Sequence, residues 1–243
     1  MNSDLSFCLP YVYEYVKNRI KYQGVSPEKN VGIWVEPSEI KFKLANRFYK
    51  NELCIYGAYI RGGSWDINQT SEDTVYARKI DGEKPPRSLI KIEDMPIYRS
   101  FKEHFLHDIE WEDTEFYTLV HEMHKSGHLI STKYSPSRID NRLEYIDRLY
   151  SSIQEQGYKN SIRSSVYDRV IVNIGRDGRI ILGGDGFHRT MLSKLIGVER
   201  IPVRIFVRHQ HWQDKRYHVY KNQTITDDLK NHPDIINCKN RLT

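Results

Sequence analysis

The sequence predicts a protein of the α/β or α+β class. The stretch 180–207 has the pattern of a short buried strand, a glycine-rich turn, a helix and a second strand. Just upstream, Asp177-Gly178 separates two β-branched runs, which is the strongest hairpin signal in the chain. Helical periodicity over 96–126 adds helices to these strands. Strands and helices therefore belong to one fold.

The composition is that of a globular protein, with 243 residues, 39% hydrophobic and 28% charged. A net charge of +5 permits an anionic ligand or nucleic acid. Lysine and arginine are scattered, which favours a phosphorylated small molecule over DNA. Three distant cysteines without C-x-x-C spacing suggest reduced thiols in a cytoplasmic protein. No apolar run is long enough for a membrane span, and the N-terminus lacks signal-peptide features, so no membrane partner is expected.

The remaining elements follow from local patterns. Pro10 fits the first turn of a helix that runs to about Lys21. Apolar spacing predicts a helix over 143–153, which Gly157 ends. Further strands are expected at 31–35, 52–60, 170–174, 179–182 and 201–207, with minor strands or ordered loop at 77–80 and 88–92 and a polar C-terminal tail.

The turn after the 180–182 strand has the chemistry of a phosphate-binding site. Glycines allow a ligand to approach the backbone, and the first N–H groups of a helix have no partner inside it. His188 and Arg189 add one switchable and one permanent positive charge. The spacing is that of neither a P-loop nor a GxGxxG fingerprint. The alternative is a tight turn beside a solvated His-Arg pair.

Three segments of the chain share a recognisable pattern: LGGDGFHRTMLSKLIGVERIPVRIFV, the preceding helix LEYIDRLYSSIQEQGY, and IWVEPSEIKFK near the N-terminus. Together they resemble the ParB/sulfiredoxin-like superfamily. The resemblance covers 31–43 and 140–208. It implies one domain with a small mixed β-sheet core, a largely helical insertion at 44–139 and a C-terminal tail at 209–243. The insertion is expected to cover the phosphate loop and to form the pocket for a second substrate.

In this superfamily the turn binds nucleotide phosphates, so the resemblance implies ATP or ADP as cofactor, or CTP, with Mg²⁺. Asp185 matches the aspartate of the family's free-serine kinase, where the acid serves substrate or metal. Phe187 stands where sulfiredoxin has its cysteine, and a phenyl ring is no nucleophile, which excludes sulfinic-acid reduction. The implied phosphate-binding residues are Gly183, Gly184, Gly186, His188, Arg189 and Thr190.

The catalytic base is expected outside the family's usual position, because 41–44 contains no acid. Asp66 is the first candidate, beside Asp185 and His188. It lies in a second glycine turn, residues 61–66. Arg61 of the same turn would bind an anionic substrate; otherwise this is a surface turn packed on Trp65.

Two further groups complete the expected site. Glu36 and Glu39 are alternative acids, although acids at a strand end commonly cap or solvate it. Arg208 and Trp212 directly follow the last core strand, where a base could stack on the indole and the guanidinium could reach a phosphate. Otherwise they form a patch at the rim of the sheet.

These features predict a nucleotide-dependent phosphotransferase of the kinase type, or a nucleotide hydrolase, acting on a small hydroxyl compound. The alternative is a nucleotide-switched, ParB-like DNA-binding, nuclease or regulatory protein. The residues after 207 leave too little room for the DNA-binding and dimerisation domains of ParB proteins, which weighs against that alternative. A third interpretation makes the core a scaffold and places the activity in the insertion.

Overall fold

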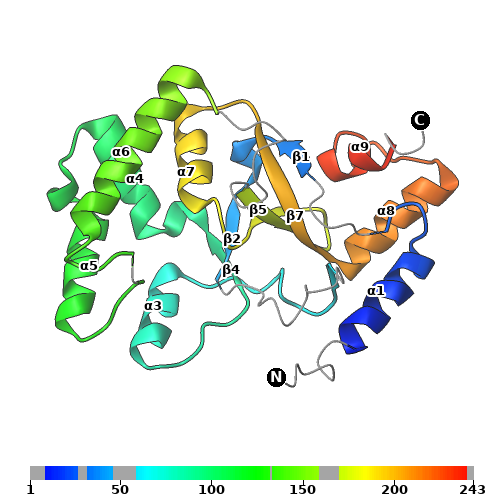
Figure 1. Cartoon of the computed structure of the whole chain (residues 1–243), viewed down its shortest axis with the longest axis horizontal. Helices are drawn as coiled ribbons and strands as arrows, with labels where there is room; N and C mark the ends of the chain where they lie inside the picture. The colour runs from blue at the N-terminus through cyan, green and yellow to red at the C-terminus, as the bar shows by residue number, and fades with distance from the viewer. Residues whose placement is uncertain (1–8, 27–31, 46–58, 132, 159–169, 240–243) are drawn as a thin grey trace, which may run out of the picture.

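The computed structural model describes residues 9–26, 32–45, 59–131, 133–158 and 170–239. These residues form a mixed sheet with helices on both sides (Figure 1). The strands are β1 (Gly32–Val35), β2 (Phe42–Leu44), β3 (Ile60–Arg61), β4 (Leu89–Lys91), β5 (Val170–Ile174), β6 (Ile180–Leu182) and β7 (Ile201–His209). The helices are α1 (Leu9–Lys21), α3 (Glu72–Ile80), α4 (Pro96–His107), α5 (Glu115–Lys125), α6 (Ile139–Gln156), α7 (Phe187–Ile196), α8 (Gln210–Asn222) and α9 (Pro233–Lys239). The α/β class is therefore confirmed.

The sheet order is β1-β7-β5-β6-β2-β4, and β3 also pairs with the end of β7. β5 and β7 run parallel, whereas β5 and β6 form the antiparallel hairpin that Asp177-Gly178 predicts. Both central strands carry buried valine and isoleucine at alternate positions, and the residues between them are buried or half-buried, as expected of strands that are covered on both faces. None of the described helices combines the length and the apolar character that a membrane span requires.

The helices fall into two groups (Figure 1). Helices α3 to α7 lie on one side of the sheet, and α1, α8 and α9 lie on the other. The predicted helical region 96–126 is two helices, because Asp108 takes a left-handed conformation and ends α4. The insertion adds strands β3 and β4 to the sheet as well as helices, so it is less purely helical than expected.

Two sequence predictions are wrong. The segment 77–80 is the end of α3, not a minor strand; Ser71 begins this helix by accepting a hydrogen bond from the Thr74 N–H. The expected tail contains α8 and α9, and α8 is anchored by the fully buried Trp212. Of the strand expected at 52–60, residues 52–58 lie outside the described part of the chain.

Candidate functional site

The glycine turn connects β6 to α7. Gly186 has φ +85°, and a Cβ atom there would lie 2.6 Å from the Val170 Cα. The turn thus presses against β5 and requires glycine. No side chain caps α7, so the first-turn N–H groups of Phe187 and His188 have no partner within the helix. This helix terminus is suited to an anion.

Other polar groups of the turn form hydrogen bonds within the protein that stabilise the conformation of the turn. The Gly183 N–H donates to the Ile171 carbonyl at 2.7 Å. The Thr190 N–H and hydroxyl both donate to the Gly186 carbonyl, at 2.9 and 3.0 Å. Gly183 and Thr190 were expected to bind phosphate, but these hydrogen bonds give them a structural role instead. The amides that remain for a ligand lie between them.

A cavity of about 600 Å³ lies against the turn and the start of α7. Gly183, Gly184, Asp185 and Gly186 line it together with the first residues of α7. The opposite wall comes from α3, the starts of α4 and α5, residues 130, 131, 133 and 134, and α6. Residues of the segment 44–139 therefore line the same cavity as the glycine turn, while the assignment of this segment as an insertion stays a prediction.

The cavity is rich in positive charge. Five of its lining residues are lysine or arginine, and two are acids. The cations are Lys43, Lys79, Lys133, Arg142 and Arg189, and the acids are Glu72 and Asp185. Burial lowers the pKa of Lys79, whose ammonium donates to the Ile130 carbonyl. Such a lining favours an anionic ligand.

His188 lies in the cavity wall, but it is not the cation that the sequence suggested. Burial, reinforced by the charges of Arg142 and Lys133, lowers the pKa of His188 to about 3. The Arg142 Nη2 donates to the His188 Nδ1 at 2.9 Å, so Nδ1 carries no hydrogen. The Nε2–H therefore faces the hydroxyl of Tyr134, whose pKa burial raises to about 12. His188 is a neutral link that positions Arg142 and Tyr134.

The buried state of His188 predicts a pH dependence of stability. Its folded pKa lies below the ordinary 6.5, so the unfolded chain takes up the proton first. Stability is then fully present above pH 6.5 and falls by up to about 1.4 kcal/mol per pH unit below it. We expect urea unfolding between pH 6.5 and 5 to show this loss, and His188→Gln to reduce it. His232, whose pKa burial also lowers, contributes to the same slope.

Gln can accept from Arg142 and donate to Tyr134, so the His188→Gln variant keeps both hydrogen bonds without titrating. The exposed His107 offers a matched control in His107→Gln. An unchanged slope in His188→Gln would contradict a neutral His188.

Asp66 lies outside this cavity, contrary to the expectation that it acts as a catalytic base. It is buried beneath the hairpin turn, where it accepts hydrogen bonds from the Arg176 backbone N–H at 2.6 Å and from Nη2 at 2.8 Å. Burial acts to raise the pKa of Asp66, but the Arg176 hydrogen bonds outweigh burial and lower it. Asp66 therefore pins the second glycine turn to the hairpin, with Trp65 packed below.

Arg208 and Trp212 also lie outside the first cavity. Both are buried and donate to Asp234: Arg208 Nη2 at 2.7 Å and Trp212 Nε1 at 2.9 Å. They attach α8 and α9 to the end of β7. The predicted contacts with a nucleotide base and phosphate are therefore wrong.

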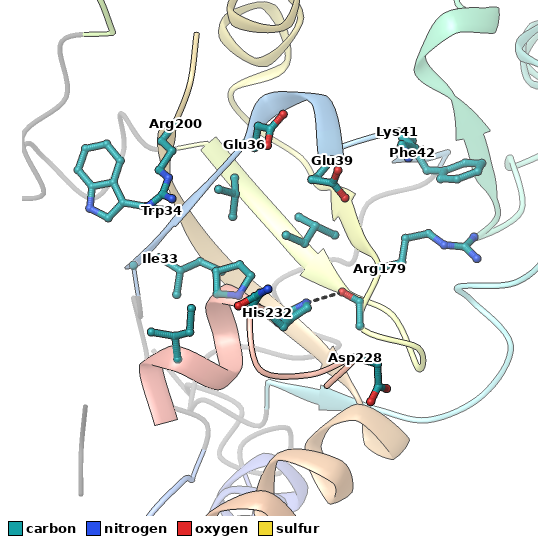
Figure 2. Close-up of a pocket in the computed structure, with 17 residues that line it drawn as sticks. Ile33, Trp34, Glu36, Glu39, Lys41, Phe42, Arg179, Arg200, Asp228 and His232 are labelled. Carbon is teal, nitrogen blue, oxygen red and sulfur yellow. Dashed lines mark hydrogen bonds between the residues drawn. The ribbon is translucent and has the colours of Figure 1, made fainter. Parts of the chain in front are cut away.

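Arg61 and Glu36 lie apart from the glycine turn as well. Arg61 is exposed at the end of β3. Glu36 accepts a hydrogen bond from Ser38 and lines a second cavity, of about 760 Å³, between β1, the hairpin and the segment before α9. Figure 2 shows this cavity, in which Glu36 and Glu39 lie with Arg179 and Arg200, and His232 donates to the Gly178 carbonyl. Its charges are balanced, which does not select an anion.

The sequence did not single out several residues that line the first cavity. Arg142 directly precedes the predicted helix over 143–153, Tyr134 lies in the loop before it, and no motif marks either residue. Glu72 follows Ser71, a helix-capping signal that would have predicted α3 and its acidic first turn.

Comparison with known proteins does not identify the chain: no protein-family model, curated protein or solved structure matches it. Among the described residues, no group of three or more His, Cys, Asp or Glu side chains could hold a metal ion by itself. Asp185 is the carboxylate that the turn itself contributes to the cavity lining. A functional assignment therefore depends on the chemistry of the cavity.

Proposed function

We propose that the protein is a nucleotide-binding enzyme, an ATP- or ADP-dependent phosphotransferase or a nucleotide hydrolase. One observation supports this most directly. A single cavity joins an uncapped helix start and a glycine turn with five basic side chains. These are the components that bind a polyphosphate in other folds, although here they have a different spacing.

Each group has a role in this proposal. The first-turn amides of α7, with Arg142 and Arg189, hold the phosphates. Neutral His188 orients the Arg142 guanidinium through Nδ1. Asp185, with phosphate oxygens, would hold Mg²⁺, which binds through one or two carboxylates and substrate phosphates and neutralises developing charge. Catalysis would then depend on positioning and charge neutralisation.

The location of the cations favours a small ligand over DNA. They converge on a cavity that the insertion walls off, whereas duplex binding requires basic residues spread over an open face. A salt-dependent shift of duplex DNA in a gel would instead support the ParB-like alternative.

Arg189→Ala is expected to weaken ATP binding at least about tenfold, because a hydrogen bond to a charged group is worth about 1.5–3 kcal/mol. Titration calorimetry with ATP and Mg²⁺ measures this change, and ADP and CTP rank the nucleotides. Arg200→Ala is the matched control, since Arg200 is exposed and lines the other cavity. Equal affinities of Arg189→Ala and wild type would refute the phosphate site.

A further inference from the structure

Two buried polar atoms in the wall of the first cavity have no hydrogen-bond partner among the described residues. One is the Glu72 Oε2 and the other is the Arg142 Nε. Glu72 is only 5% exposed, so water does not replace the missing partner at the surface. A buried polar group without a partner costs about 1–3 kcal/mol, and more if it is charged. Both residues line the same cavity, so a ligand that binds there can supply the partners.

The two atoms require hydrogen-bond partners of opposite kinds, one an acceptor and the other a donor. The Arg142 Nε is a donor and suits a phosphate oxygen, as does the start of α7. The Glu72 carboxylate accepts hydrogen bonds and repels a phosphate. A ligand that satisfies both must carry an anionic group and, separately from it, a hydrogen-bond donor such as a hydroxyl or an amino group.

The surroundings of Glu72 keep this acceptor available. No ion pair within the described part of the chain involves Glu72; Lys79, two turns further along α3, is subject to the Glu72 charge but donates to the Ile130 carbonyl. Tyr76 follows Glu72 by one turn and forms a side-chain hydrogen bond with it, which leaves only Oε2 of the carboxylate without a partner. Burial, then the Glu72 charge and this hydrogen bond, raise the pKa of Tyr76 well above its usual value. Tyr76 is therefore an uncharged neighbour. The cavity keeps one buried carboxylate oxygen for an external donor.

We propose that Glu72 recognises a hydrogen-bond donor on the nucleoside part of the bound nucleotide. This proposal rests on the proposed nucleotide-binding function. The phosphates lie at Arg142 and the start of α7, and the nucleoside reaches toward α3, so that each unpartnered atom receives a partner of the right kind. Glu72 then makes the cavity select a nucleotide over an inorganic polyphosphate.

The test compares ATP with inorganic tripolyphosphate by titration calorimetry, on wild type and Glu72→Gln. We expect Glu72→Gln to bind ATP at least about tenfold more weakly, because a charged acceptor is lost. Tripolyphosphate should bind the variant as well as wild type or more tightly, because a negative charge is removed from the cavity. Affinities for both ligands that change together would overturn the proposal.

Asp73→Asn is the matched control. Asp73 is exposed in the same first turn of α3, so its neutralisation changes the helix terminus and the net charge equally but should alter neither affinity. Glu72→Gln removes a buried charge without an ion-pair partner, so its melting temperature should not fall. A fall would indicate a structural role and overturn the proposal. Failure of wild type to bind ATP at all would refute the proposed function itself.

Two analogues identify the donor. 2′,3′-Dideoxy-ATP lacks the ribose hydroxyls, and ITP lacks the amino group of the base. We expect one of them to bind wild type more weakly than ATP and to lose that disadvantage in Glu72→Gln, as a double-mutant cycle requires of two groups in contact. If both bind wild type as tightly as ATP does, Glu72 contacts neither group and the proposal fails.

Discussion

Replacement of Asp234 by alanine is expected to lower the free energy of unfolding by about 3–5 kcal/mol, the usual cost of breaking a buried ion pair. The fully buried Asp234 carboxylate accepts from Arg208 at 2.7 and 2.9 Å and from Trp212 at 2.9 Å, and it pairs with the Arg216 Nε at 3.0 Å. Burial acts to raise the pKa of Asp234, but the two arginines outweigh burial and keep it well below its usual value. Alanine would leave both guanidinium groups buried without this carboxylate.

Urea unfolding at pH 7 measures the effect, and Asp227→Ala is the control. Asp227 also pairs with a cation, Lys230, at 2.9 Å, but both side chains are largely exposed. Exposed ion pairs contribute about 0–1 kcal/mol. If the two variants lose similar stability, the Asp234 cluster does not hold the C-terminal helices.

Gly186→Ala is expected to cost about 2–5 kcal/mol, as the sum of two effects. A left-handed backbone costs a residue with a Cβ about 1–2 kcal/mol. Overpacking adds about 1–3 kcal/mol, because the new atom would lie 2.6 Å from the Val170 Cα. Since Val170 begins β5, a strand at the centre of the sheet, neither side can move away without disturbing the core.

Gly197→Ala separates these effects, because Gly197 lies at the other end of the same helix. Gly197 has φ +80°, close to the value at Gly186, but a Cβ atom there would meet nothing within 4 Å. Its loss should therefore be limited to about 1–2 kcal/mol. A Gly186→Ala variant no less stable than Gly197→Ala would mean that the turn does not press on β5.

Local signals predicted the central part of the fold. Asp177-Gly178 gave the hairpin, and the change from β-branched residues to helical spacing after Gly186 gave α7. The prediction failed at α3, where a minor strand or ordered loop is expected at 77–80. The capping hydrogen bond to Ser71 and the acidic first turn favour the helix there.

The candidate site was predictable only in part. The glycine turn and Arg189 line the cavity as expected. Asp66 does not line the cavity. An acid beside a glycine turn is expected to face a substrate, but the Asp66 carboxylate instead pairs with Arg176 of the hairpin, which is distant in sequence. Arg142 and Glu72 were missed because which polar residue of a helix faces α7 depends on tertiary packing.

The hairpin tip has a consequence for how mutational scans of this protein should be interpreted. Gly178 accepts a hydrogen bond from His232 and packs on Trp212, and only Arg179 and three-residue β6, about 16 Å of extended chain, separate this contact from Gly183. None of the described side chains of α9 lines the first cavity. Substitutions in the C-terminal helices can therefore shift the glycine turn from a distance. Weakened affinity in such a variant reports lost scaffold alignment and is no proof of direct contact with a nucleotide.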